Sequence, residues 1–321
     1  MVASPLPARE AIAARPAPRA AVAVVHWGHG GDVMRCLRAV AGSTFPAQPL
    51  IVVDNGTGTL SMADVTAAAP GAVLITLPEN IGFSGGSNIA IERALAEGAD
   101  YVLLLNNDAT LEPDCLGELV RVASSMPRVG AVGAKVLSAT DSATIWAAYG
   151  RLTYRAALVK LVGQGEADSQ RFNEVCEVDC VPGCSMLLSR AAIAEIGLLD
   201  DRFFAYHEDV DWCTSVRQRG WRVLFAPAAR VIHLGEASLS NGNGSANPAR
   251  YLSARNTMLF ARKHAGAREW LRLGITIGGS LAREYVRGRR RGDTRIVTLL
   301  ARGYVDGLLG REVPYRSFGL R

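Results

Sequence analysis

The sequence predicts an α/β fold in which a mixed, mainly parallel central sheet is flanked by helices. Short runs rich in Val, Ile and Leu alternate with segments whose apolar residues have helical spacing. The runs are apolar throughout, which is typical of strands that are covered on both faces. A chain of 321 residues, 49% hydrophobic and 20% charged, is also long enough to bury such a sheet.

The first half of the chain contains four predicted strands, at Ala20–Val25, Pro49–Asp54, Ala72–Thr76 and Tyr101–Leu105. Helical spacing is found between them, at Asp32–Gly42 and Asn88–Ala96. In such sheets ligands bind beyond the carboxyl ends of the strands. His26, Asp54 and Asp108 all fall at predicted strand ends, and we therefore expect them to converge on one site.

The second half follows a different pattern. It contains an extended run at Val175–Leu188 broken at Pro182–Gly183, helices at Arg190–Ile196 and Asp209–Arg219 that each end at a glycine, a strand at Trp221–Phe225, a flexible loop at Asn241–Asn247 and helical chain from Tyr251 onward. We divide the chain into a flexible leader (1–19), an α/β domain that carries the expected site (20–265) and a helical, basic extension (266–321).

Charge is concentrated at the end of the chain. The net charge is +5 overall, and residues 283–321 carry ten arginines against four acids. Such a tail suits an anionic membrane surface, a nucleic acid or simple solubility. No run of about 20 apolar residues and no apolar signal core is found. The cysteine usage fits a reducing cytoplasm best, and we expect a cytoplasmic protein.

The six cysteines do not indicate a disulfide scaffold. Cys176, Cys180 and Cys184 are spaced by four residues rather than in the Cys-x-x-Cys pairs of zinc sites. On one strand all three would point to the same face, where we expect them to pack in the core.

An acidic cluster is the strongest candidate for a general base. Glu208, Asp209 and Asp211 lie at the predicted start of a helix, close to the aromatic Phe203, Phe204 and Trp212. A carboxylate that is partly desolvated there could accept a proton. The alternative is ordinary acidic capping of a helix N-terminus.

A second candidate site follows the strand Tyr101–Leu105. Asp108, with Asn106 beside it, offers the oxygen ligands that Mg²⁺ and Mn²⁺ prefer. His233, at the end of an apolar run, would be a third ligand. The alternatives are that Asn106–Asp108 only forms a turn and a helix cap, and that His233 is structural.

The glycine-rich segment Asn80–Asn88 precedes a helix and could bring backbone amides close to phosphates. A rival reading takes Gly28, Gly30 and Asp54 as a dinucleotide-binding fingerprint. It is rejected because the third glycine position holds Val33 and the acidic cluster stays unexplained.

These residues together resemble the bacterial family 2 glycosyltransferases, which have the GT-A fold, and most closely the rhamnosyltransferase-like members. Matching runs follow the family's order from about Ala20 to Lys263: Val52–Gly56, Asn80–Phe83, Gly86–Asn88, Leu103–Asp108, Gly183–Leu188, Ile196–Asp200, Phe203–His233 and Arg255–Asn256. Any single run is common, whereas the ordered set is specific.

The resemblance implies a role for each matching residue. Asp209 would be the catalytic base, with the adjacent Glu208 as the alternative. Asp108, His233 and Asn106 would hold Mn²⁺ or Mg²⁺ at the donor diphosphate; the family often has Asp at the position of Asn106. Asp54 would contact the donor base, with His26 beside it. The expected donor-binding set is His26, Asp54, Asn80, Gly82, Gly86, Asn88, Asn107 and Arg255.

The implied activity is an inverting, metal-dependent transfer of a sugar from a nucleotide diphosphate, dTDP-rhamnose or a UDP-sugar, to an acceptor hydroxyl in cell-surface polysaccharide or glycolipid synthesis. The alternative is a non-catalytic nucleotide-sugar-binding or scaffold protein on the same fold. The acceptor would be a glycan or a lipid-linked saccharide, and no nucleic acid partner is expected. Residues 271–321 could lie on the inner face of the membrane, pack on the catalytic domain or support a homodimer.

Overall fold

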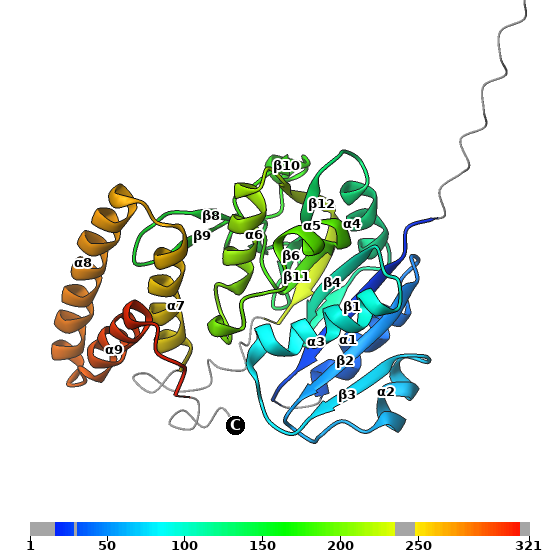
Figure 1. The fold of residues 1–321 in the computed structure, drawn as a ribbon, viewed down its shortest axis with the longest axis horizontal. Coiled ribbons are helices and arrows are strands. Elements are labelled where there is room, and N and C mark those ends of the chain that lie inside the picture. Colours follow the sequence, from blue (N-terminus) through cyan, green and yellow to red (C-terminus); the bar gives the residue numbers. More distant parts are fainter. Residues whose placement is uncertain (1–16, 29–30, 235–247, 315–321) are drawn as a thin grey trace, which may run out of the picture.

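The computed structural model describes residues 17–28, 31–234 and 248–314. The predicted loop at 241–247 and most of the predicted leader lie outside these ranges. The described chain forms a mixed sheet with helices on both faces, and three C-terminal helices gather at one end (Figure 1). None of the described helices is both long and apolar enough to cross a bilayer.

The central sheet confirms the predicted mixed, mainly parallel arrangement. Its main path runs β10–β12–β6–β11–β4–β1–β2–β3, while β5 and β7 pair with β12 and β6. The strands are β1 (Ala20–His26), β2 (Ala47–Asn55), β3 (Val73–Leu77), β4 (Tyr101–Asn106), β5 (Ala109–Leu111), β6 (Val129–Ser138), β7 (Ile145–Ala147), β10 (Cys176–Glu177), β11 (Ser185–Ser189) and β12 (Arg222–His233). β11 is antiparallel to both β4 and β6, and β12 is parallel to β6.

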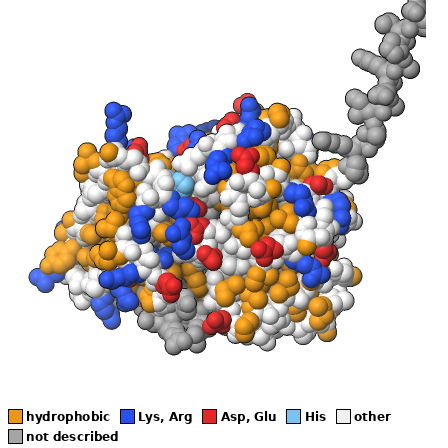
Figure 2. Space-filling view, viewed as in Figure 1, with side chains coloured by type: hydrophobic (Ala, Val, Ile, Leu, Met, Phe, Trp, Pro, Cys, Tyr) orange, Lys and Arg blue, Asp and Glu red, His pale blue; other side chains and the backbone are white. Residues whose placement is uncertain are grey.

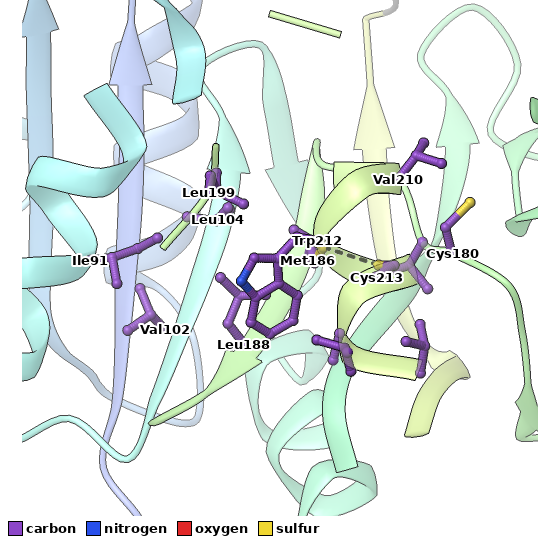
Figure 3. Packing of buried hydrophobic residues seen from close by; sticks show 14 of the residues in the cluster. Ile91, Val102, Leu104, Cys180, Met186, Leu188, Leu199, Val210, Trp212 and Cys213 are labelled. Atoms are coloured by element: carbon purple, nitrogen blue, oxygen red, sulfur yellow. Dashed lines mark hydrogen bonds between the residues drawn. The ribbon is translucent and has the colours of Figure 1, made fainter. Parts of the chain in front are cut away.

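Helices cover both faces of this sheet, as the apolar strands predict. On one face Leu104 of β4 belongs to a core with α3 (Gly82–Ala96), α5 (Arg190–Ile196) and α6 (Glu208–Gln218). Figure 3 shows Ile91, Leu104, Met186 and Trp212 meeting in this layer. On the other face Leu103 and Leu105 pack against α1 (Gly31–Ala41), α2 (Met62–Ala68) and α4 (Cys115–Ala123).

Several local features differ from the predictions. Helix α3 begins at Gly82 rather than at Asn88, so the glycine-rich segment is mostly helix. β12 continues past Phe225 to His233 because its register shifts between Ala226 and Arg230 and pairing with β6 resumes. The two-stranded sheet of β8 (Tyr149–Leu152) and β9 (Val159–Val162) was not predicted.

The cysteines do not share one strand, because the segment 178–184 is irregular between β10 and β11. Cys180 and Cys184 are nevertheless buried, as predicted for core packing, whereas Cys176 is partly exposed. Burial raises the pKa of the Cys184 thiol well above its ordinary value, which keeps it protonated.

The C-terminal helices are α7 (Pro248–His264), α8 (Ala267–Arg291) and α9 (Arg295–Leu309). α9 packs directly on α7: the backbone of Tyr251 and Arg255 leaves no room for a Cβ atom at Gly303 and Gly307. α7 falls inside the predicted domain 20–265, and α9 of the predicted extension packs on it.

Candidate active site

A cleft of about 430 Å³ opens at the carboxyl ends of β1, β2 and β4, where Val25, Asn55 and Asn106 line it. Its other walls come from the segment 180–184, the turn and helix start at 204–210, and the hairpin β8–β9. His26 and Asp54 are neighbours in the β1–β2 register, directly behind this edge. Strand ends therefore converge as the sequence predicts.

The structure divides the predicted site residues into two groups. Seven line the cleft: Asn80, Gly82, Asn106, Asn107, Glu208, Asp209 and His233. The other six lie behind its surface or away from it: His26, Asp54, Gly86, Asn88, Asp108 and Arg255.

Asp108 and His233 form one corner of the site because β5, which directly follows Asp108, pairs with β12, which ends at His233. Asp108 Oδ1 lies 3.1 Å from His233 Nε2, and Asn106 Nδ2 lies 3.3 Å from the same nitrogen. Asp108 is only 9% exposed, and its Oδ1 makes no hydrogen bond with any described residue.

The chemistry of this corner fits a divalent cation. A buried carboxylate oxygen without a hydrogen-bond partner, an imidazole and an amide are ligands that Mn²⁺ or Mg²⁺ accepts. In the described ranges no group of three or more His, Cys, Asp and Glu residues is placed to hold a metal ion. A cation here would thus share its coordination with oxygens of a bound substrate.

His26 and Asp54 are both fully buried and belong to a hydrogen-bonded network behind the cleft. Asn107 Nδ2 donates to His26 Nδ1 over 3.0 Å, which leaves Nε2 to donate to Thr59 Oγ1 at 3.2 Å. Asp54 Oδ1 accepts bonds from the backbone N–H and the hydroxyl of Thr57. Asp54 thus shapes the loop after β2, and its predicted contact with a nucleotide base stays a prediction.

The two adjacent carboxyl groups at the start of α6 have different environments. Asp209 accepts backbone N–H bonds at both oxygens, from Gly183 and from Val210, each over 2.8 Å. Burial raises the pKa of Asp209, and these bonds oppose that rise. Glu208 is 5% exposed, and its Oε2 has no hydrogen-bond partner among the described residues. Burial and the nearby Asp209 charge raise the pKa of Glu208 to about 8.

The turn before α6 has an unusual backbone. Phe204, Tyr206 and His207 all have φ values between 63° and 71°. Residues other than glycine adopt this left-handed backbone conformation only under constraint. Asn256 of α7 supplies the constraint, since its Nδ2 donates to the carbonyl groups of Phe203, Ala205 and Tyr206 over 2.7–2.8 Å.

Arg255, next to Asn256, also holds this turn. It was predicted to contact the donor phosphates, but its guanidinium makes other bonds. Its guanidinium is buried and donates to the carbonyls of Arg202 and Arg311 and to Asn256 Oδ1. These bonds use Nε, Nη1 and Nη2 together. Arg255 thus ties the turn to the segment that follows α9, rather than facing the cleft.

Asn88 and Gly86, also predicted to bind the donor, have packing roles in the structure. Asn88 exchanges two hydrogen bonds with the backbone of Leu199. Gly86 lies in α3 against Val25 and Asn55, where a Cβ atom would come within 2.9 Å of Val25 Cγ1. The glycine lets the helix approach the sheet closely. A glycine needed for such packing and a glycine of a phosphate-binding loop look the same in a sequence pattern.

Residues 18–263 match the model described as glycosyltransferase like family 2. The chain belongs to this family. The membership identifies a glycosyltransferase and favours an enzyme over the non-catalytic alternative. An N-acetylglucosaminyl-diphospho-decaprenol L-rhamnosyltransferase of Mycobacterium tuberculosis is 27% identical over 284 residues, covering 81% of this chain and 90% of the relative. The hexosyltransferase Agl10 of Haloferax volcanii, named for low-salt glycan biosynthesis, is 25% identical over 161 residues, or 48% and 49% of the two chains.

Solved structures show the GT-A fold that this glycosyltransferase shares. GalNAc-T7, crystallised with UDP, GalNAc and Mn²⁺, superposes with a TM-score of 0.58 at 16% identity, over 80% of this chain and 54% of that one. The mannosyltransferase PcManGT from Pyrobaculum calidifontis, in complex with GDP-Man and Mn²⁺, gives 0.57 at 15% identity, over 92% and 88%.

The structure of this family 2 glycosyltransferase adds site residues that sequence reasoning missed. Trp146 packs edge-on against His233, with ring centroids 4.7 Å apart, and Trp27 and Tyr206 also line the cleft. Isolated aromatic residues carry no periodic signal. The acidic run beside Tyr206 was the only local hint for that residue, and nothing in the sequence separates Trp27 or Trp146 from core tryptophans.

The buried Glu208 carboxyl is expected to make stability depend on pH. Between the ordinary pKa of 4.5 and the folded-state value of about 8, the folded protein binds the proton more tightly than the unfolded chain. The free energy of unfolding should therefore fall as pH rises through this window. In urea unfolding, the free energy of unfolding of Glu208→Gln relative to wild type should increase across this pH window and level off above about pH 8. The exposed Glu177→Gln is the control, and a constant difference between Glu208→Gln and wild type would contradict the assignment.

Removing the Asn256 amide should destabilise the turn that carries the carboxylates. Asn256→Ala leaves buried carbonyl groups unpaired, at a cost of roughly 2–4 kcal/mol in unfolding free energy. It should also lower kcat, because the helix start moves. Ser253→Ala, on the same helix and 3.4 Å from His207 Nε2, is the matched control and should change stability by less than about 0.5 kcal/mol. Equal stability of the two variants would show that Asn256 does not hold the turn.

Proposed function

We propose that this glycosyltransferase transfers a sugar from a nucleotide diphosphate donor to an acceptor hydroxyl, with a divalent cation and with inversion. One observation carries the proposal: a cation-compatible corner at His233 and Asn106 and the carboxyl pair Glu208–Asp209 line the same cleft. Such a transfer needs positive charge at the departing diphosphate and a base at the acceptor.

Asp108, His233 and Asn106 would hold Mn²⁺ or Mg²⁺. The ion, when bound, supplies the Lewis acidity that stabilises charge on the leaving diphosphate. GalNAc-T7 and PcManGT were both solved with Mn²⁺, which supports the choice of metal. Asn107 would orient the donor through the same strand end, and its bond to His26 fixes its amide.

Asp209 is the better candidate for the base. Two backbone N–H groups hold it at the N-terminus of α6 and favour its ionised form. Burial and the Asp209 charge raise the pKa of Glu208, which favours its protonated form and makes it the weaker base of the two. Asp209 would take the proton of the acceptor hydroxyl as its oxygen attacks the anomeric carbon. A single displacement from the face opposite the diphosphate inverts that centre.

The donor is dTDP-rhamnose or a UDP-sugar, and the acceptor is a glycan or a lipid-linked saccharide in cell-surface polysaccharide or glycolipid synthesis. The similarity to the mycobacterial N-acetylglucosaminyl-diphospho-decaprenol L-rhamnosyltransferase supports this choice. We propose that the reaction takes place on the cytoplasmic side of the membrane.

Nucleotide binding should depend on both the metal and Asp108. Calorimetric titration with UDP and dTDP is expected to show binding in Mn²⁺ that is at least about tenfold weaker with EDTA or in Asp108→Asn. Glu177→Gln makes an equivalent change of charge on the exposed strand β10 and should bind as wild type. Whichever of UDP and dTDP binds more tightly indicates whether the donor is a UDP-sugar or dTDP-rhamnose. If folded wild-type protein binds neither nucleotide in the presence of Mn²⁺, the proposal is contradicted.

Asp209→Asn should lower kcat by roughly 10²–10⁴-fold, the usual contribution of a general base. Its donor affinity should stay near wild type, because the carboxylate is assigned to the acceptor. Glu208→Gln changes the neighbouring carboxyl and should retain most of kcat. Steady-state kinetics with both variants checks the assignment, and the reverse ranking would make Glu208 the base.

A further inference from the structure

Helix α8 has an apolar face that the described chain does not cover. Leu271 and Ile275 are each 68% exposed, and Tyr285 and Val286 are about half exposed. At 3.6 residues per turn, these four positions fall on one side of the helix. A Cβ atom added at Gly278, on the same side, would meet nothing within 4 Å. Only Leu273 and Gly288 of this 25-residue helix are buried.

Positive charge borders this face. α8 contains seven arginines and two glutamates, Glu269 and Glu284. Arg287 pairs with Glu284 over 3.0 Å. Six other arginines are exposed and form no ion pair with a residue in the described ranges: Arg268, Arg272, Arg283, Arg289, Arg290 and Arg291. Figure 2 shows hydrophobic side chains over the C-terminal helices at the left of the molecule, with Lys and Arg side chains around them.

α8 is also connected to the cleft. The loop between β8 and β9 reaches the helix, where the Ala156 N–H donates to Thr276 Oγ1 over 3.0 Å. Val159 and Leu161 of the same hairpin line the cleft. α8 and the cleft are thus joined through one hairpin.

We propose that this face of α8 binds the surface of an anionic lipid bilayer. Apolar side chains flanked by unpaired arginines match the boundary between acyl chains and negatively charged head groups. A second copy of the chain would be a poor match, because pairing this face with itself would bring clusters of unpaired arginines together. The inference rests on the proposed function and extends it, because an enzyme held at the bilayer meets an acceptor that is carried on a membrane lipid.

Vesicle co-sedimentation of the full chain tests this surface. We expect binding to phosphatidylcholine vesicles that contain phosphatidylglycerol and at least about tenfold weaker binding to phosphatidylcholine alone. The double substitution Leu271→Glu and Ile275→Glu should weaken binding to the anionic vesicles by about tenfold or more. Met62→Glu, an exposed apolar position on α2, is the matched control and should bind as wild type.

Two outcomes would overturn the proposal: equal binding of wild type and the double variant, or no preference for anionic vesicles. Sedimentation velocity is run in parallel, and a wild-type dimer that the double variant dissociates without weakening vesicle binding would assign the face to a second copy instead. UDP and dTDP binding is measured on the same proteins without vesicles. Vesicle binding without nucleotide binding would leave the surface in place while contradicting the proposed function, so the two failures are distinguishable.

Discussion

One asparagine amide holds the backbone on which the carboxyl pair depends. The turn at 203–207 bends through left-handed conformations at Phe204, Tyr206 and His207, and each of these costs free energy in a residue with a side chain. Asn256 bonds three carbonyl groups of that turn, and Arg255 bonds the carbonyl immediately before it. α6 starts directly after the turn, so the position of Glu208 and Asp209 follows from α7.

The C-terminal helices therefore belong to the architecture of the site as well as to the surface. Arg255 also bonds the carbonyl of Arg311, and Val313 belongs to one hydrophobic cluster with Phe204 and Tyr251. Phe204 lines the cleft. Contacts of this kind connect the extension after α7 to the cleft wall, although the family match ends at residue 263. A segment outside the matched region thus supports residues inside it.

The two acidic parts of the site differ in their electrostatics. Glu208 and Asp209 lie in a buried setting that raises the pKa of both, and only Asp209 has backbone N–H groups on both of its oxygens. In the other part, Asp108 Oδ1 lies 3.1 Å from His233 Nε2 and makes no hydrogen bond with any described residue. One buried carboxylate suited to a proton and another suited to a cation fit a reaction in which a diphosphate leaves as a hydroxyl is deprotonated.

The sequence by itself determined the layered sheet, because strands that are apolar on both faces, such as Tyr101–Leu105, need helices on both sides. It also placed His26, Asp54 and Asp108 at or just after the carboxyl ends of strands, which parallel strands bring to one edge of the sheet; the order of those strands came from the structure. Only the tertiary structure decided what each polar residue does there. Arg255, Asn88 and Gly86 fit a ligand-binding pattern, yet they bond or pack against Arg311, Leu199 and Val25, residues that lie at least 56 positions away in the chain. Partners that distant leave no local pattern, because side-chain contacts depend on how elements meet rather than on the spacing of residues within one element.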